Sequence, residues 1–458
     1  MPLNFEILAR SAASRARLGR VTTPHGSFDT PAFMPVGTRG TVKGVLPGMV
    51  AATGAQIILG NTYHLMLRPG SELIERLGGL HRFANWPAPM LTDSGGYQAY
   101  SMAGINTIND DGVTFKSIVD GAMVKLTPES ATRIQNQLGA DIIMAFDDCP
   151  PSVDPEAGPI NQTRLRLAAM RDATAMPGSN GQLADAGNAD QGDAQGARPN
   201  LRRKSRAYDH ASRLKLANER TVRWLERCKA EHLRLGGHDR RALFGIVQGG
   251  TDLAQRSWSA QRICAIDLPG YAIGGVAVGE QSGDIARVVS HTAPLLPEAK
   301  PRYLMGVGYE RDLLAGVFAG VDMFDCVLPT RNGRNANAFT STGQIRLRNA
   351  QYMEDTGPIE AGCDCPACAP GPNNNLAWAS TGDGPFSRAY IRHLFLSKEM
   401  LGPILVSLHN LRHFQRFMAD VRRTILTDQW DGLIGLWPVA ASTGSGSTEG
   451  AGKASDLQ

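Results

Sequence analysis

The chain has 458 residues, of which 42% are hydrophobic and 20% are charged, with a formal net charge of +4. This is an ordinary globular composition, and no apolar run approaches the roughly 20 residues that a membrane-spanning helix needs. The balance of 47 basic and 43 acidic residues is too even to establish nucleic-acid binding, although it permits a local basic patch. The Arg-rich residues 1–20 lack the apolar core of a signal peptide, so we expect a solvated basic face and a cytoplasmic location.

The seven cysteines do not form the even, regularly spaced set of a disulfide framework. Three of them lie within "CDCPAC", residues 363–368, a spacing from which three thiolates can close on one zinc ion. The other four stand alone, at Cys149, Cys228, Cys264 and Cys326. A structural zinc site needs a fourth ligand, and the downstream candidates are His393, His409 and His413. The spacing from the cysteines does not choose among these three histidines.

Three segments have a composition that differs from that of a folded core. Residues 172–200 contain one large aliphatic residue, Leu183, among Gly, Asn, Asp, Gln and Ala, which predicts a disordered insertion. A shorter loop insertion is expected at 370–385, and residues 439–458 are expected to form a disordered tail.

Elsewhere, short apolar runs alternate with amphipathic helical patterns along the chain. The predicted strands are 32–38, 56–62, 89–96, 141–148, 243–250, 271–280, 303–308 and 323–330. The helical patterns between them include 128–139, 218–232 and 310–320. Eight such units indicate a (β/α)₈ barrel, although a doubly wound sheet shares the same alternation.

The polar residues favour the barrel, because nearly every strand run ends in Asp, Asn, Gln or Gly. Barrel enzymes collect their active sites at the C-terminal ends of all strands, whereas a doubly wound sheet concentrates them at one switch point. We therefore predict an α/β fold, a TIM barrel over residues 1–350 that includes the low-complexity insertion. A zinc-binding subdomain and the final barrel helix are predicted over residues 351–430.

Three aspartates stand at the ends of predicted strands: Asp93 in "LTDSGGYQ", Asp147 in "MAFDDC" and Asp325 in "MFDCVLPT". A lone aspartate in such a place is more often a helix cap or turn residue. Three at equivalent positions favour chemistry at a glycosidic carbon, where one carboxylate attacks and another handles the leaving group's proton.

Glycine pairs in "DSGGYQ", "VQGG" and "IGGVAVGE" would let a planar ligand approach the backbone closely, and none follows a dinucleotide-binding spacing. Gln248 has a donor and an acceptor that match the edge of a heterocyclic base. Tyr97 and Met305 could cover the two faces of that base, although each is by default a core residue. Arg331 and Arg334, just beyond Asp325, could hold phosphates.

Together, "LTDSGGYQ", "MAFDDC", "FGIVQGG", "YAIGGVAVGE", "RYLMGVG", "MFDCVLPTR" and "CDCPAC" resemble the bacterial queuine/tRNA-guanine transglycosylase family. The resemblance runs from "TPHGSFDTPAFMPVGT" to "LHNLRHFQRF", with the insertions excepted. It implies a zinc-containing TIM barrel, usually a homodimer, that acts in queuosine biosynthesis. The implied reaction exchanges guanine-34 in the anticodon of GUN tRNAs (Asp, Asn, His and Tyr) for 7-aminomethyl-7-deazaguanine (preQ1) through a covalent enzyme–tRNA intermediate.

The resemblance also implies a role for individual residues, with Asp325 as the nucleophile at C1′ and Asp93 as the group that assists proton transfer. The implied base-binding residues are Asp93, Tyr97, Asp147, Cys149, Gln248, Gly275, Val276 and Met305. The implied RNA-contacting residues are Gly306, Val307, Gly308, Tyr309, Glu310, Arg311, Asp312, Thr330, Arg331, Asn332, Gly333 and Arg334. The implied ligands of one structural Zn²⁺ per subunit are Cys363, Cys365, Cys368 and His409.

Two departures and three alternatives accompany this resemblance. Val276 stands where Leu is usual in the bacterial family, and Asp148 where Glu is common, whereas Cys149 and Val278 match the bacterial pattern. One alternative is a eukaryotic-type enzyme that inserts the bulkier queuine. A second is a non-catalytic tRNA-binding partner subunit, which would lack the full acid set. A third is a metal-dependent barrel hydrolase, which would need zinc ligands at the strand ends, where no H-x-H pair occurs.

Overall fold

The computed structural model describes residues 2–102, 106–154, 209–277, 280, 282–369 and 384–441. Parallel strands close into a barrel in the order β10-β11-β12-β13-β14-β4-β5-β6. Their bounds are β4 Ala32–Gly37, β5 Ile58–Gly60, β6 Met90–Thr92, β10 Ile142–Met144, β11 Ala242–Val247, β12 Gly270–Ile273, β13 Arg302–Leu304 and β14 Met323–Cys326. Each strand falls within one residue of a predicted run, so the predicted (β/α)₈ barrel is confirmed.

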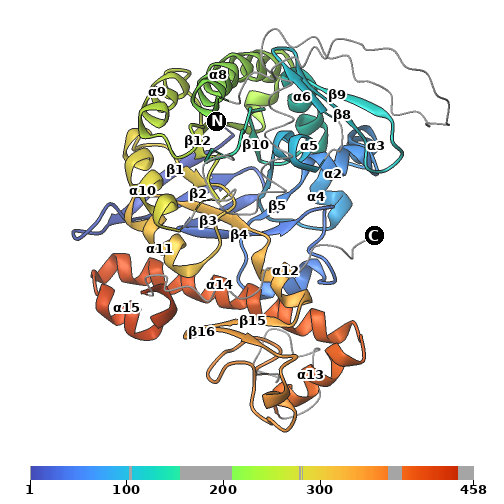
Figure 1. The fold of residues 1–458 in the computed structure, drawn as a ribbon, viewed down its shortest axis with the longest axis vertical. Coiled ribbons are helices and arrows are strands. Elements are labelled where there is room, and N and C mark those ends of the chain that lie inside the picture. The colour runs from blue at the N-terminus through green and yellow to red at the C-terminus, as the bar shows by residue number, and fades with distance from the viewer. Residues whose placement is uncertain are drawn as a thin grey trace, which may run out of the picture.

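Helices surround this barrel (Figure 1) and follow its strands along the chain. They are α2 Thr62–Leu67, α3 Ser71–Arg76, α4 Gly79–Ala84, α5 Gly96–Met102, α6 Pro128–Leu138, α8 His210–Arg234, α9 Leu253–Cys264, α10 Ser282–Thr292 and α11 Glu310–Phe318. Local sequence explains their ends: Thr127 and Ser130 form a capping box at the start of α6, and Gly139 ends it in a left-handed conformation. The three predicted helical patterns correspond to α6, part of α8, and α11.

Two small antiparallel sheets flank the barrel. The first holds β1 Asn4–Arg10, β2 Arg17–Thr23 and β3 Gly26–Thr30, and the second holds β7 Asn106–Asn109, β8 Gly112–Lys116 and β9 Met123–Leu126. The expected solvated face of arginines at residues 1–20 is wrong for Arg17, whose side chain is only 1% exposed. Its guanidinium donates to both oxygens of Asp322, at 2.8 and 2.6 Å, and this bidentate pairing makes the burial of the charge possible.

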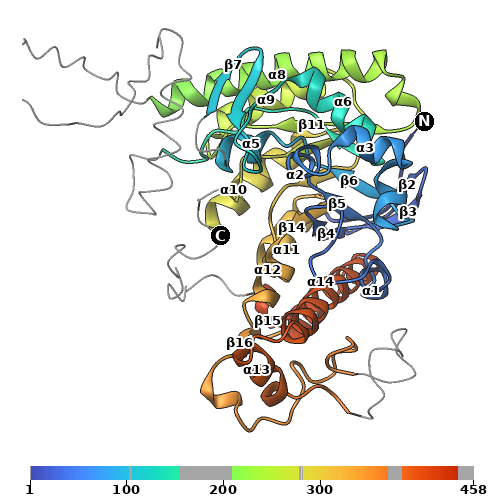
Figure 2. The ribbon, with the colours of Figure 1, turned by 90° about the vertical axis from the view of Figure 1, so that its right-hand side faces the viewer.

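A C-terminal region packs beside the barrel through the long helix α14, Leu401–Thr427. In both views α14 lies between the barrel and a small subdomain (Figures 1 and 2). The further elements of this region are α12 Leu328–Arg334, β15 Asn337–Thr340, β16 Gly343–Arg346, α13 Arg388–Leu396 and α15 Trp430–Leu436, and α14 also contacts α1, Pro47–Ala52. Ala336, Ala338 and Leu347 share one hydrophobic cluster with the cysteines of 363–368. We therefore propose that the C-terminal subdomain begins near residue 336.

The predicted insertion at 172–200 lies outside the described residues, as do 370–383 of the second loop and 442–458 of the expected tail. At the start of that tail, residues Pro438–Ala440 form a short 3₁₀ helix. Val439 N donates to Ser341 O at 3.0 Å, and Ala440 is buried, so this part of the tail belongs to the folded structure.

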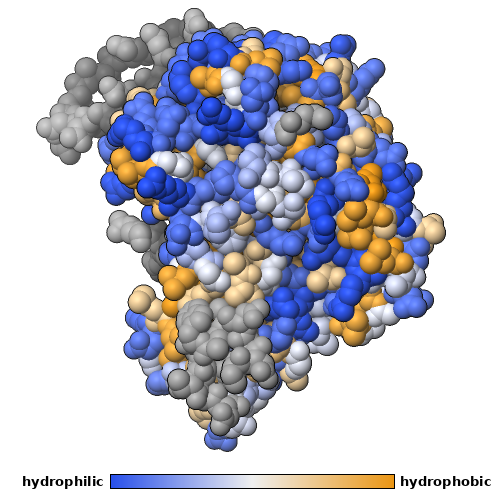
Figure 3. All heavy atoms as spheres, turned by 180° about the vertical axis from the view of Figure 1, so that it is seen from behind, coloured by the Kyte–Doolittle hydropathy of each residue, from blue (hydrophilic) through white to orange (hydrophobic). Residues whose placement is uncertain are grey.

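None of the helices in the described ranges is both long and apolar enough to cross a membrane. The face turned away from the viewer in Figure 1 is mostly hydrophilic, with hydrophobic residues in smaller patches (Figure 3). Inside the barrel, alternate strand residues such as Met34, Leu59, Phe244 and Tyr303 fill the core. This packed interior leaves the loops after the strands as the place for polar chemistry.

Helix α12 packs against α14 through Gly333, and this contact gives a test of how the two are held together. A Cβ added at Gly333 would lie 2.8 Å from the backbone N and Cα of Ser407, which cannot move aside easily. We expect Gly333→Ala to lower the free energy of unfolding by about 1–3 kcal/mol in denaturant titrations, because the two helices must separate. The control is Gly432→Ala in α15, where a Cβ would meet nothing within 4 Å. Equal effects of the two substitutions would contradict the close approach.

Candidate functional site

The three predicted aspartates lie at the C-terminal end of the barrel. Asp93 directly follows β6, Asp147 follows β10, and Asp325 lies near the end of β14. Asp93 and Asp147 are buried, and Asp325 is half-buried. Burial raises the pKa of Asp93 to about 7, and the negative charges of Asp325 and Asp147 contribute to this rise. The structure therefore brings the three carboxylates together in one site.

Asp93 is held by the start of α2. Asn61 Nδ2 donates to Asp93 Oδ2 at 2.5 Å, and the backbone N of Thr62 donates to Oδ1 at 2.8 Å. Asn61 is also the N-cap of α2, because its Oδ1 accepts from His64 N. Burial outweighs these donors and leaves the pKa near 7, so this carboxyl can both give and accept a proton at neutral pH.

Asp325 is oriented by two donors that converge on one of its oxygens. Tyr303 Oη donates to Oδ1 at 2.5 Å, and the backbone N of Gly306 donates to the same atom at 2.8 Å. Burial raises the pKa of Asp325, while these two hydrogen bonds oppose the rise. Within the described residues both of these bonds go to Oδ1 and neither goes to Oδ2.

Asp147 and Gln248 form a pair between neighbouring strand ends. Gln248 Nε2 donates to Asp147 Oδ2 at 2.6 Å, and Ser94 Oγ donates to Oδ1 at 3.5 Å. Burial raises the pKa of Asp147 to about 6, against the effect of the Gln248 bond. Gly275 has a φ of 63°, and a Cβ there would lie 2.1 Å from Gln248 Oε1. Only glycine allows the backbone to approach the Gln248 amide this closely.

Arg256 of α9 was not singled out from the sequence, yet it fixes the loops that carry this pair. Its side chain is fully buried, and its guanidinium donates to the carbonyls of Val247 at 3.0 Å, Gly274 at 2.6 Å and Gly275 at 3.0 Å. These bonds join the end of β11 to the end of β12. An arginine in an amphipathic helix gives no sequence signal that it is buried.

Asp148, the residue found where Glu is common, also has a positioning role. Arg213 donates to both of its oxygens, at 2.6 and 3.0 Å, and Arg220 donates to Oδ2 at 2.5 Å. Burial alone would raise the pKa of Asp148, but the two arginines outweigh it and hold the pKa below its usual value. Both arginines come from α8, so this cluster attaches α8 to the loop that carries Asp147.

The remaining predicted base-binding residues also follow barrel strands. Cys149 and Val276 are buried, and Met305 is half-buried against the barrel core. Tyr97 in α5 has 42% of its surface exposed, which leaves its ring accessible to a ligand. Val278 lies outside the described residues. The described members of this group therefore lie at the same end of the barrel as the three aspartates.

The two predicted RNA-contacting segments are only partly accessible. The buried members are Val307, Gly308, Glu310, Asp312, Thr330 and Gly333. The exposed or half-exposed members are Gly306, Tyr309, Arg311, Arg331, Asn332 and Arg334. Glu310, for example, pairs with His413 of α14 at 2.5 Å in a fully buried contact. Only the exposed or half-exposed residues can therefore contact a large partner through their side chains, and the buried residues pack beneath them.

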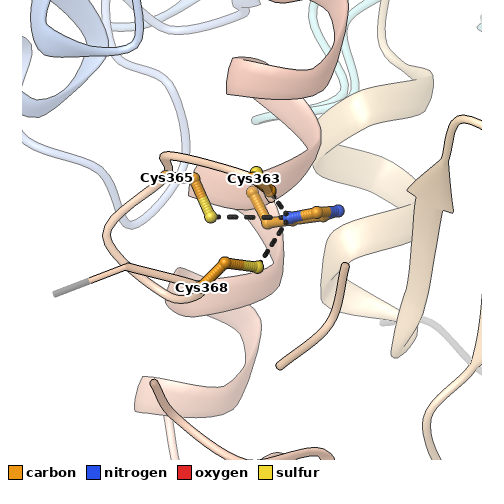
Figure 4. A group of neighbouring side chains, drawn as sticks. Cys363, Cys365 and Cys368 are labelled. Atoms are coloured by element: carbon orange, nitrogen blue, oxygen red, sulfur yellow. Dashed lines mark hydrogen bonds between the residues drawn. The ribbon is translucent and has the colours of Figure 1, made fainter. Parts of the chain in front are cut away.

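Cys363, Cys365 and Cys368 lie close together in the C-terminal subdomain (Figure 4), and His409 lies with them. All four are buried, and their ligand atoms lie within 4.8 Å of one another. His409 Nδ1 is 3.6, 3.4 and 3.4 Å from the three sulfur atoms in chain order. His409 Nε2 donates to Phe339 O at 2.7 Å, which fixes the ring so that Nδ1 faces the thiols. This donor set could hold a metal ion.

The structure also separates the three candidate histidines. His393 is exposed on α13, and His413 pairs with Glu310, so only His409 lies with the cysteines. The next residue, Asn410, donates through Nδ2 to Pro329 O at 2.9 Å and to Asn337 O at 3.0 Å. The helix that carries His409 is thereby bonded to both ends of the segment that contains Arg331 and Arg334.

A second cluster, which the sequence did not reveal, joins His25, His81 and Asp141 at the opposite end of the barrel. His25 Nδ1 and His81 Nε2 lie 2.7 and 3.0 Å from the two oxygens of Asp141. The two rings are stacked, with centroids 3.6 Å apart and an interplanar angle of 11°. Lone pairs lie in the ring planes, so parallel stacked rings cannot both aim at one ion. We interpret this cluster as hydrogen bonding that closes the bottom of the barrel.

Comparisons with known proteins agree with this geometry. The pattern of the family described as queuine tRNA-ribosyltransferase matches residues 12–182 and 202–437. The chain belongs to this family. A queuine tRNA-ribosyltransferase of Acetivibrio thermocellus is 44% identical over 427 residues, which cover 93% of this chain and 95% of the relative. A queuine tRNA-ribosyltransferase of Thermus thermophilus is 44% identical over 424 residues, which cover 93% of this chain and 90% of the relative. One of Methylibium petroleiphilum is 44% identical over 423 residues, which cover 92% of this chain and 94% of the relative.

Membership in the queuine tRNA-ribosyltransferase family confirms the resemblance seen in the sequence and identifies the chain as an enzyme, a pentosyltransferase. The barrel, the three carboxylates and the Cys₃His cluster thus belong to one transferase.

The adjacent residues Asp147 and Asp148 should make the stability of the fold depend on pH in opposite directions, because the pKa of Asp147 is raised and that of Asp148 is lowered. Because the pKa of Asp147 is raised, the folded state binds more protons than the unfolded state between about pH 4 and pH 6, so stability falls as the pH rises through this range. Asp147→Asn can keep the hydrogen bond from Gln248. We expect this substitution to raise the free energy of unfolding by about 1–3 kcal/mol at pH 8, and we expect the increase to vanish near pH 4. Urea titrations at both pH values measure this.

Asp148→Asn is the matched comparison, since its charge is removed next to two buried arginines. The lowered pKa of Asp148 means that it stabilises the fold above its unfolded pKa and that this stability is lost as the pH falls. We expect Asp148→Asn to lower the free energy of unfolding by about 3–5 kcal/mol at pH 8. Shifts of the same sign in the two variants at pH 8 would refute the opposite environments.

Proposed function

We propose that this enzyme is a tRNA-guanine transglycosylase that replaces guanine-34 of GUN tRNAs (Asp, Asn, His and Tyr) with preQ1 in queuosine biosynthesis. The observation that carries the proposal is the meeting of Asp93, Asp147, Asp325 and Gln248 at one end of a barrel of this family. The relatives from Acetivibrio thermocellus and Thermus thermophilus carry the name queuine tRNA-ribosyltransferase.

The first half of the proposed reaction removes guanine. The target nucleotide leaves its stack and enters the pocket, since a stacked base cannot be reached. Asp325 Oδ2 attacks C1′ of the ribose, the C1′–N9 bond breaks, and Asp93 gives a proton to the departing base. The hydrogen bonds from Tyr303 and Gly306 to Oδ1 keep Oδ2 directed at the substrate. The product of this half is a covalent ester between Asp325 and the ribose.

The second half reverses these steps with the incoming base. Asp93 takes a proton from preQ1, the base nitrogen forms the new bond to C1′, and the Asp325–ribose bond breaks. Two displacements at C1′ preserve its configuration, as the exchange of one base for another requires. A carboxyl with a pKa of about 7 is suited to transfer protons in both directions.

The base itself would be recognised by the polar edge formed by Asp147, Gln248 and the backbone at Gly275. Gln248 is fixed because its Nε2 donates to Asp147. Tyr97 and Met305 would cover the two faces of the base, and Cys149 and Val276 would line the pocket. Val276 is smaller than the usual Leu while its backbone groups are unchanged, so we expect a small effect on base binding.

Two alternatives remain beside this proposal. A eukaryotic-type enzyme would accept queuine, and Cys149, which matches the bacterial pattern, favours preQ1 instead. A non-catalytic tRNA-binding partner subunit would not need the full set of acids, whereas here Asp93, Asp147 and Asp325 are all present and oriented by donors.

We further propose that the tRNA docks over the exposed Tyr309 and Arg331 and the half-exposed Arg311 and Arg334, and that the enzyme acts in the cytoplasm as a homodimer. The homodimer proposal is supported by large apolar side chains that are exposed at the start of α1, after residues 350–352, at the end of α13 and at the start of α14, because such side chains can be covered in an interface. They are Leu46 at 62%, Met353 at 60%, Leu396 at 54% and Met400 at 79%.

Base exchange under single-turnover conditions tests the function directly. We expect the enzyme to release labelled guanine from a tRNA with a GUN anticodon and to incorporate preQ1, with queuine a much poorer substrate. Asp325→Asn should be folded yet trap no covalent tRNA adduct, because an amide cannot form the ester. Asp239→Asn, at an exposed position of Gly237–Asp239, is the control and should behave as wild type. A normal adduct with Asp325→Asn would refute the nucleophile, and efficient queuine incorporation would favour the first alternative.

For the metal centre we propose one structural Zn²⁺ held by Cys363, Cys365, Cys368 and His409. Three thiolates and one imidazole complete a tetrahedral site with no position for a reactive water, so the ion supplies folding energy rather than chemistry. Through Asn410 it would hold the segment between Pro329 and Asn337 in place.

Metal analysis and unfolding of matched histidine variants test this assignment. Wild type should contain about one zinc per chain, and His409→Ala should lose the metal, become less stable and bind tRNA more weakly, because its docking segment loosens. His393→Ala, which changes an exposed histidine on the neighbouring helix, should keep zinc and stability. Normal stability of a zinc-free wild-type preparation would contradict the structural role.

A further inference from the structure

A pocket with a volume of about 420 Å³ lies far from the candidate active site. Its lining includes Arg302 at the first position of β13, whereas the aspartates of the active site lie at the other ends of the barrel strands. The rest of the lining comes mainly from β1, β2 and the turn between them, which the sequence marked as Arg-rich. The lining residues that matter here are Arg10, Ser14, Arg15, Arg17, Glu298 and Arg302.

Positive charge exceeds negative charge in this pocket. Of its four arginines, Arg17 is paired with Asp322, and Arg10 is paired with Glu298 at 2.5 Å. Arg15 and Arg302 form no ion pair with a carboxylate of the described residues. The pocket therefore carries a formal excess of two positive charges.

Arg302 is the most unusual of these residues, because only 6% of its surface is exposed. Its Nη2 donates to Leu296 O at 2.6 Å and its Nη1 to Gly320 O at 3.4 Å, while its buried Nε has no partner among the described residues. Burial and the nearby charge of Arg17 lower the pKa of Arg302 to about 10. A buried cation next to another cation, with a free N–H, would be stabilised by an anion.

Arg10 and Arg15 can supplement Arg302 at the open side of the pocket. The side chains of Arg10 and Glu298 are 54% and 66% exposed, and an exposed pair of this kind contributes little, so Arg10 can turn to another anion at small cost. Ser14 lies in the same turn and offers a hydroxyl, which in the present structure donates to Ser11. Arginine forks match the paired oxygens of a tetrahedral oxyanion.

We propose that this pocket is a second ligand site that binds the phosphate group of a small molecule, or free phosphate, through Arg302, Arg15 and Arg10. The excess of two positive charges matches a phosphate dianion better than a single carboxylate. The volume is in the range of small-molecule sites, roughly 300–1,000 Å³, and not that of a groove for a nucleic acid. A bound phosphate would join the β1–β2 turn to the start of β13 and so stabilise the folded state.

Calorimetric titration of the full chain with inorganic phosphate, at constant ionic strength kept with chloride, tests the site. We expect saturable binding of one phosphate and a higher melting temperature in its presence. Arg15→Gln removes an exposed guanidinium without an ion-pair partner, so it should fold normally and bind phosphate about tenfold more weakly, the loss of one charge-assisted hydrogen bond. Arg76→Gln makes the same charge change at an exposed position of α3 and should bind as wild type.

Further measurements distinguish a phosphate ester from free phosphate as the ligand. Competition by adenosine monophosphate would show that the pocket accepts a phosphate ester, and its failure would restrict the ligand to the free anion. Arg302→Met is a second variant, whose folding is checked by circular dichroism, and it should bind phosphate at least tenfold more weakly. Guanine exchange should be unchanged in Arg15→Gln, since the pocket is remote from the aspartates.

Three results would overturn the proposal. One is the absence of saturable phosphate binding by wild type. Another is an equal loss of binding in Arg15→Gln and Arg76→Gln, which would indicate general surface charge. The third is a loss of tRNA affinity in Arg15→Gln with unchanged phosphate binding, which would assign these arginines to RNA contact.

Discussion

The central constraint on this structure is that three carboxylates lie together in one site, where burial opposes their ionisation. Each is kept in place by a donor from a neighbouring element: Asn61 for Asp93, Tyr303 for Asp325, and Gln248 for Asp147. These donors are fixed in turn. Asn61 caps α2, and Tyr303 is packed inside the barrel. Gln248 lies against the backbone of Gly275, whose carbonyl accepts a hydrogen bond from Arg256. The barrel provides this support because all its strands end at the same rim.

The C-terminal region holds a basic segment, α12 with Arg331 and Arg334, beside that rim. Helix α12, which carries Arg331 and Arg334, is fastened to α14 by close packing at Gly333 and by a hydrogen bond from Asn410. The adjacent His409 faces the three cysteines. One turn of α14 therefore links the Cys₃His cluster to the segment that carries Arg331 and Arg334.

Much of this was predictable from sequence, because the relevant signals are local. Apolar runs that end in polar residues identified all eight barrel strands, and "CDCPAC" identified the cysteine cluster. The parts that were missed depend on partners remote in sequence. Arg17 looked solvated because its partner Asp322 is 305 residues away, and Arg256, Tyr303 and Asn61 look like ordinary helix, strand and turn residues. Spacing alone could not select His409 either, since only the fold shows that His413 is occupied by Glu310.

The adjacent Asp147 and Asp148 show how one strand end can serve two purposes. Asp147 faces Gln248 and Ser94, whereas Asp148 faces the arginines of α8. Asp148 takes both nearby arginines, Arg213 and Arg220, which leaves Asp147 with the neutral Gln248 as its partner. The pKa of Asp148 therefore falls while burial raises that of Asp147 to about 6. A carboxyl in that range can hold or release a proton near neutral pH, and the two arginines do not lower its pKa because both of them bind Asp148.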